Sequence, residues 1–172
     1  MEKNNSFQMK ICVVGTFAVG KSSLVRRFVE NRFDSHYVNT IGATIRQKKL
    51  IWDGLSINMN IWDMEDNTDV MHSSYLWEAN AFLAVCDLSR LQTIPFLWSN
   101  IRQLQIHYPN VPVIVAGNKV DLVKQPRLPL PDDLQESVEA VVLTSAKTGE
   151  NVYRLFSLMA NKMVAPAAVS VY

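Results

Sequence analysis

Gly15-Thr16-Phe17-Ala18-Val19-Gly20-Lys21-Ser22 is the stretch that decides the fold, because it fits the pattern G-x-x-x-x-G-K-[ST]. It follows an apolar run predicted to be a strand and opens a predicted helix. The two glycines permit backbone angles that let successive N–H groups point at phosphate oxygens, helped by the helix N-terminus. Lys21 supplies a positive charge to the outer phosphates and Ser22 a hydroxyl to Mg²⁺. The pattern predicts a nucleotide phosphate site without choosing between ATP and GTP.

The rest of the chain alternates apolar strands with helical patterns, which predicts an α/β domain with a mostly parallel sheet covered on both faces. Asp53-Gly54 joins two strand patterns and predicts a hairpin, hence one antiparallel edge strand. The proline-bearing segment Pro126 to Pro131 predicts a loop. The other predicted strands are Lys10–Val14, Arg46–Trp52, Leu55–Asp63, Ala81–Val85, Val111–Ala116 and Val138–Thr144, and the predicted helices are Lys21–Glu30, Pro95–His107 and Asn151–Met163.

Composition places the chain among ordinary globular domains. It has 172 residues, of which 48% are hydrophobic, and a formal net charge of +1. This argues against a disordered chain and against general attraction to nucleic acid. No apolar run is long enough to span a bilayer. Cys12 and Cys86 lie in apolar runs without metal-ligand spacing, so we expect two buried free thiols.

A second motif follows a later predicted strand. Asn118-Lys119-Val120-Asp121 fits N-K-x-D, and the carboxylate of Asp121 suits the N1–H and 2-amino groups of guanine, a pairing that adenine does not offer. Thr144-Ser145-Ala146-Lys147 follows the last strand, and the Ala146 N–H is expected to read the guanine oxygen. Asn118 is expected to bridge to the neighbouring loop. Together with the first motif, these residues predict a guanine-nucleotide site at the strand ends.

From Met9 to Val164 the chain resembles the Ras superfamily of small GTPases, and its Rab branch most closely. The resemblance is carried, in matching order, by Gly15 to Ser22, Arg27 to Phe33, Thr40-Ile41-Gly42, Trp62-Asp63, Asn118 to Asp121 and Thr144 to Lys147. It implies a P-loop small G domain with three α/β/α layers and a six-stranded, mostly parallel sheet. Residues 1–8 are then an N-terminal extension, 9–164 the domain and 165–172 a tail or the start of a linker.

The resemblance also implies ligands and site residues. The cofactors are GTP or GDP with Mg²⁺, and the residues implied in catalysis are Lys21, Thr40 and Asn67. Ser22, Thr40 and Asp63 are implied as Mg²⁺ ligands, Asp63 through a water. Phe33 is implied to pack edge-on against guanine. The nucleotide-binding residues are expected to be Gly15, Ala18, Val19, Gly20, Lys21, Ser22, Ser23, Phe33, Tyr37, Thr40, Asn118, Lys119, Asp121, Ser145, Ala146 and Lys147.

The departures from the family pattern concern hydrolysis. Asp66 stands where a glycine would contact the γ-phosphate, and like charges at about 4 Å repel by roughly 4 kcal/mol at an effective dielectric near 20. Either Asp66 points away or GTP is disfavoured relative to GDP. Asn67 stands in place of the water-positioning glutamine, and a displacement of ~1 Å can cost on the order of 10²-fold in rate. Phe17 replaces a small residue and is expected to obstruct an arginine finger. We therefore expect slow intrinsic hydrolysis.

The chain end lacks the cysteines that Rab proteins prenylate. No lipid anchor is therefore predicted. The chain is a shortened one, a module of a longer protein, or a GTPase that never uses prenylation. We expect a cytoplasmic monomer that reaches endomembranes through partners.

Three functions compete on the sequence. The first is a Rab-like GTP/GDP switch in vesicle traffic or signalling, whose effectors and regulators read switch I (Asp34 to Gly42), switch II (Met64 to Leu76) and the side chains Ile45, Trp62 and Tyr75. The second is a pseudo-GTPase, an interaction module that holds nucleotide without switching. The third is an ATP-dependent kinase, which leaves Asn118 to Asp121 and Thr144 to Lys147 unexplained.

Overall fold

The computed structural model describes residues 6–36, 42–64 and 74–169. They form one six-stranded sheet in the order β2-β3-β1-β4-β5-β6, in which only the β2–β3 pair is antiparallel. The strands are β1 (Ser6–Val14), β2 (Ala43–Trp52), β3 (Leu55–Met64), β4 (Ala81–Asp87), β5 (Val113–Asn118) and β6 (Ala140–Leu143). The helices are α1 (Lys21–Glu30), α2 (Thr93–His107) and α3 (Val152–Val169), with short 3₁₀ turns η2 (Ser74–Leu76), η3 (Val120–Leu122) and η4 (Asp132–Leu134). The predicted fold class is confirmed.

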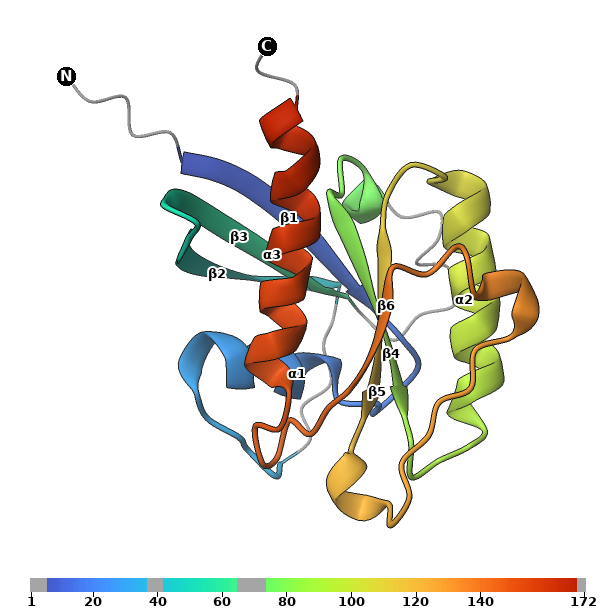
Figure 1. Cartoon of the computed structure of the whole chain (residues 1–172). Helices are drawn as coiled ribbons and strands as arrows, with labels where there is room; N and C mark the ends of the chain where they lie inside the picture. Colours follow the sequence, from blue (N-terminus) through green and yellow to red (C-terminus); the bar gives the residue numbers. More distant parts are fainter. Residues whose placement is uncertain (1–5, 37–41, 65–73, 170–172) are drawn as a thin grey trace, which may run out of the picture.

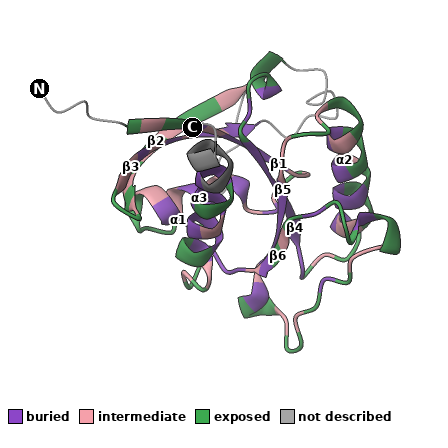
Figure 2. Ribbon diagram, turned by 45° about the horizontal axis from the view of Figure 1, so that its top comes forward, coloured by how far each residue is buried: buried purple, intermediate pink, exposed green. Residues whose placement is uncertain are grey.

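Two hydrophobic cores lie on the two faces of the sheet (Figures 1 and 2). Alternation along β1 separates them: Ile11 and Val13 face α1 and α3, whereas Cys12 and Val14 face α2. On the first face the rings of Phe28 and Phe156 stack at 4.1 Å between centroids, and this contact joins α1 to α3. The three-layer arrangement follows from this two-sided burial.

The predicted hairpin is present at Asp53-Gly54. Both residues have positive φ, 49° and 76°, as a tight two-residue hairpin turn requires. The register pairs Trp52 with Leu55 and runs on to Ala43 and Met64. β2 is therefore the antiparallel edge strand, as predicted.

Several elements extend past their predicted bounds. β1 begins at Ser6 rather than Lys10, because residues 6–8 continue the ladder with β3. α3 runs to Val169, beyond the predicted end at Met163 and into the segment expected to be a tail. Ala165, Ala167 and Ala168 favour helix there, whereas Pro166 between them does not.

The connection between β5 and β6 contains no α-helix, although parallel strands are usually joined by one. Residues 126–131 form the predicted proline loop. Its Leu128 and the following Leu134 and Val138 are buried in the core on the α2 side. The loop therefore covers this part of the sheet in place of a helix.

Both cysteines are buried free thiols, as predicted. Burial raises the pKa of Cys12 and of Cys86 to about 12. Their surroundings are apolar side chains of the α2-side core. Among the described residues, no helix combines the length and apolar character needed to cross a bilayer.

Candidate functional site

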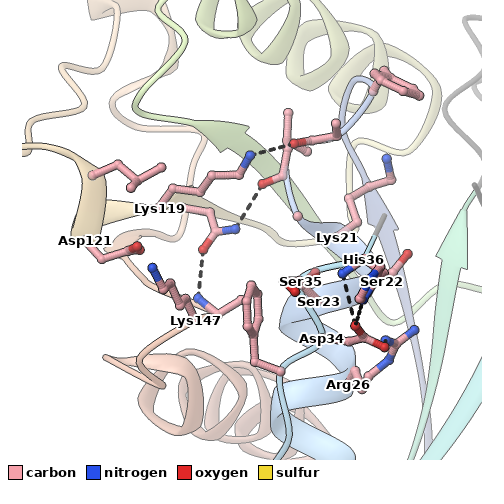
Figure 3. A pocket seen from close by; sticks show the side chains of 18 residues that line it. Lys21, Ser22, Ser23, Arg26, Asp34, Ser35, His36, Lys119, Asp121 and Lys147 are labelled. Carbon is pink, nitrogen blue, oxygen red and sulfur yellow. Dashed lines mark hydrogen bonds and ion pairs between the residues drawn. The ribbon is translucent and has the colours of Figure 1, made fainter. Parts of the chain in front are cut away.

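A cavity of about 670 Å³ opens where the carboxyl ends of the parallel strands meet (Figure 3). This is where open α/β sheets bind ligands, and the volume lies in the usual range for small-molecule sites. Its lining comes from the loop after β1, the start of α1, the segment after α1 and the loops after β5 and β6. The lining residues are Phe17, Ala18, Val19, Gly20, Lys21, Ser22, Ser23, Arg26, Phe33, Asp34, Ser35, His36, Asn118, Lys119, Asp121, Leu122, Ala146 and Lys147.

The loop from Gly15 to Gly20, called the P loop below, has little room for side chains. A Cβ on Gly15 would lie 2.5 Å from the Val85 carbonyl oxygen, and one on Gly20 would clash with the Asn118 amide. Gly20 also has φ 100° as the residue before α1, in the left-handed region that favours glycine. The loop backbone is thus packed directly against the ends of β4 and β5.

The start of α1 suits an anion. No side chain caps it, and its first turn carries no acidic residue. The N–H groups of a first helical turn lie at the positive end of the helix dipole, which favours a negative charge there. Lys21 is buried and donates from Nζ to the carbonyls of Gly15 at 3.0 Å and Thr16 at 3.3 Å. The ammonium is held beside the loop that the sequence assigns to phosphate.

Asn118 makes the bridge that the sequence predicts. Its Nδ2 donates to the Val19 carbonyl at 3.0 Å, and its Oδ1 accepts from the Ala146 N–H at 3.2 Å and the Thr144 hydroxyl at 3.3 Å. Asn118 therefore joins the P loop to the loop after β6. The Ala146 N–H, expected to read the guanine oxygen, already donates to Asn118 and would have to be shared with a base.

Asp121 is positioned by the same loop. The Ser145 hydroxyl donates to its Oδ1 at 2.6 Å, and the Ser145 Oγ in turn accepts from the Thr148 N–H at 3.1 Å. The Arg27 guanidinium steadies this loop by donating to the carbonyls of Ala146 at 2.8 Å and Lys147 at 2.6 Å. A short hydrogen bond thus orients an exposed carboxylate at the cavity, as a reader of guanine N1–H and 2-amino groups requires.

Asp87, at the end of β4, was not predicted as a site residue. Its carboxylate is 1% exposed and pairs at 2.8 Å with both Lys119 Nζ and Arg90 Nε. Burial raises its pKa, but hydrogen bonds from Lys119, Ser89 and Arg90 outweigh burial and hold the pKa below the ordinary value. Asp87 is the charged residue that ends an otherwise apolar strand, and this pattern in the sequence could have identified it as a site residue.

The remaining wall of the cavity is looser. Phe33 is 38% exposed and Asp34 lies beside Arg26, with 3.7 Å between Asp34 Oδ2 and Arg26 Nη1. The backbone N–H and ring of His36 contact Asp34 Oδ1 at 3.0 and 3.2 Å, and these bonds lower the pKa of Asp34. Arg26, Ser35 and His36 were not among the predicted binding residues.

The donor set fits a guanine nucleotide with Mg²⁺. Ser22 lines the cavity, and Asp63 is buried at the end of β3, paired in register with Val13 of β1 just before the P loop. Mg²⁺ needs only one or two protein oxygens beside phosphates and water. Among the described residues, no group of three or more His, Cys, Asp or Glu could hold a metal ion by itself. Tyr37, Thr40, Asp66 and Asn67 lie outside the described residues.

Comparison with known proteins identifies the family. The model of the Ras family matches residues 10–165. The GTP-binding protein ypt5 of Schizosaccharomyces pombe is 35% identical over 92% of this chain and 79% of its own length. The Ras-related protein Rab-5A of Dictyostelium discoideum is 32% identical over 95% of this chain and 85% of its own length. The human Ras-related protein Rab-22A is 34% identical over 87% of this chain and 80% of its own length. The chain therefore belongs to the Ras family of small GTPases and is similar to its Rab members.

Proposed function

We propose that this protein is a switch that binds GTP and GDP with Mg²⁺, hydrolyses GTP slowly and acts in vesicle traffic or signalling. Gly15 to Ser23 would hold the phosphates, and Asn118, Lys119, Asp121 and Ser145 to Lys147 the base. The observation that carries the proposal is that the P loop and Asp121 line the same cavity. Ser145 orients the Asp121 carboxylate, and Asn118 joins the P loop to the strand end beside it. The relatives named GTP-binding and Ras-related support it.

Each group would have a separate task. The N–H groups of the P loop and α1 would bind phosphate oxygens, with Lys21 supplying the charge. Ser22 and Asp63, with Thr40 from outside the described residues, would hold the Mg²⁺, which when bound neutralises charge that develops on the phosphates. Asn67 would orient the attacking water. Phe17, 54% exposed at the cavity, would obstruct an arginine finger.

Effectors and regulators are expected on the face that bears the switches. In the described part of this face, Trp62 and Tyr75 pack with 5.9 Å between ring centroids, and Ile45 pairs with Trp62 in the β2–β3 register. Ile45 and Tyr75 are largely exposed. Domain bounds of 9–164, a monomeric state, a cytoplasmic location and attachment to endomembranes through partners belong to the same proposal.

The base assignment is tested by Asp121→Asn, which keeps the shape but replaces an acceptor with an amide. We expect the wild type to bind GDP with Mg²⁺ and to reject ADP. The variant should bind GDP about 10²-fold more weakly, because a purpose-built polar partner is lost. It should gain affinity for xanthosine diphosphate, whose C2 oxygen accepts from the new amide. Equal binding of GDP and ADP by the wild type would contradict the proposal.

The pseudo-GTPase alternative rests on the switch II departures Asp66 and Asn67. It differs in what partners sense, because an interaction module holds them equally with GDP and with a non-hydrolysable GTP analogue. A tenfold preference of a partner for one nucleotide state would favour the switch. Equal affinity in both states would favour the alternative.

A further inference from the structure

Three consecutive carbonyls of the P loop are held from outside the loop. The Phe17 carbonyl accepts from Arg90 Nη2 at 2.7 Å, the Ala18 carbonyl from Lys119 Nζ at 2.9 Å, and the Val19 carbonyl from Asn118 Nδ2 at 3.0 Å. Arg90 follows the end of β4, Asn118 is the last residue of β5, and Lys119 comes directly after it. Side chains that are distant in sequence thus hydrogen-bond to the loop backbone at three successive residues.

One buried carboxylate organises two of these donors. Asp87 Oδ2 lies 2.8 Å from Arg90 Nε and 2.8 Å from Lys119 Nζ, and Oδ1 accepts from the Ser89 N–H at 2.9 Å and hydroxyl at 2.6 Å. Thr93, at the start of α2, accepts from the Asp87 N–H at 3.1 Å. Because donors surround the carboxylate, Arg90 and Lys119 have a fixed anchor rather than a solvated counterion.

These hydrogen bonds to the carbonyls also set the direction of the N–H groups in the P loop. In a trans peptide, the N–H of one residue points opposite to the carbonyl before it, and the described residues contain no cis bond. Holding the Phe17 and Ala18 carbonyls therefore directs the N–H groups of Ala18 and Val19 away from Arg90 and Lys119. Both residues line the cavity.

Ala18 gives independent evidence that the loop needs this support. Its φ is 57°, in the left-handed region that a residue with a Cβ seldom adopts. Such a conformation persists where surrounding contacts over-determine it. The two peptides that flank Ala18 are both held: Arg90 donates to the Phe17 carbonyl before it, and Lys119 donates to the Ala18 carbonyl after it.

We propose that Asp87 and Arg90 form a positioning pair for the P loop, in which Asp87 holds Arg90 against the Phe17 carbonyl and so fixes the N–H groups that receive the β-phosphate of a guanine nucleotide. The inference rests on the proposed nucleotide site. Arg90 touches neither base nor phosphate in this arrangement. Its effect is therefore confined to ligands with a phosphate that reaches the P loop.

The test is the separate affinity for GDP and GMP, because GMP lacks the β-phosphate. Arg90→Gln should weaken GDP binding about tenfold and GMP binding less than twofold. Arg90→Lys, which keeps the charge with fewer donors, should fall between wild type and Arg90→Gln. Arg102→Gln is the matched control, since Arg102 lies on α2 and pairs with the exposed Asp133 at 2.7 and 3.1 Å, away from the P loop. It should leave both affinities unchanged.

If Arg90 only stabilised the fold, Arg90→Gln would weaken GDP binding and GMP binding by the same factor, and that result would overturn the proposal. An Arg90→Gln variant with wild-type affinity for GDP would also overturn it. If the wild type binds no GDP, the proposed function fails instead. Amide hydrogen exchange of Ala18 and Val19 without added nucleotide then tests the pair alone. Exchange at least fivefold faster in Arg90→Gln than in Arg102→Gln supports the pair, and equal exchange overturns it.

Discussion

Two carboxylates show how differently two parts of the site are built: Asp87, which pairs with the cations that hold the P loop, and Asp34, which lines the cavity. Asp87 is buried, anchored by two cations and by Ser89, whereas Asp34 has 48% of its side chain exposed and lies 3.7 Å from its arginine partner. The wall made by the P loop and the ends of β4, β5 and β6 is tied together by side chains that bond to backbone. The wall from Phe33 to His36 is held by bonds of the exposed Asp34 to the exposed His36 and to the partly buried Arg26.

The difference indicates which part of the site is preorganised. A wall fixed before binding keeps phosphate and base donors in place, which reduces the ordering required of a ligand complex. A wall held by exposed pairs contributes little to stability, because solvent screens such pairs. In a switch, the second kind of wall is the one expected to differ between nucleotide states.

The largest effect is expected for Asp87→Asn set against Asp34→Asn. Loss of the buried carboxylate leaves Arg90 and Lys119 without their shared anchor, and breaking a buried pair costs about 3 kcal/mol of unfolding free energy. We expect that loss in urea denaturation, with GDP affinity reduced at least tenfold. Asp34→Asn should leave the denaturation midpoint unchanged. Equal effects of the two substitutions would contradict the contrast between the walls.

The pH dependence sharpens the same contrast with a smaller effect. The pKa of Asp87 is lower in the folded protein than its ordinary value near 3.8, so the carboxylate stabilises the fold above that value. This contribution is lost as the pH falls below about 4, through the folded-state pKa. The stability of Asp87→Asn should therefore decline less steeply than that of wild type below pH 4. If the unfolding free energies of wild type and Asp87→Asn change in parallel between pH 3 and 6, this assignment is contradicted.

Sequence reasoning predicted those features that local chemistry determines. The Gly-Lys-Ser turn, the Asp53-Gly54 hairpin and the bridge by Asn118 each follow from residue types at fixed spacing, and the structure contains them. The proline loop at 126–131 was also predicted, because proline excludes helix and central strand.

Features that depend on distant contacts were missed. Arg90 and Phe17 are separated by 73 positions, and nothing in Asp87-Leu88-Ser89-Arg90 alone indicates that its arginine reaches the P loop. The start of β1 at Ser6 depends likewise on pairing with β3, because Ser6 and Gln8 are polar and lack the apolar run that marks a strand. The use of the Ala146 N–H by Asn118 depends on how the loops after β5 and β6 meet in the fold, which no motif specifies.

Single-turnover conversion of bound GTP to GDP in the presence of Mg²⁺ is the decisive measurement for a GTP-binding switch with slow hydrolysis. We predict a stable GTP complex that converts slowly, and a rate at least tenfold higher in the double variant Asp66→Gly with Asn67→Gln. Wild-type protein that retains no GTP, or a double variant with an unchanged rate, would contradict a slow GTPase limited by Asp66 and Asn67.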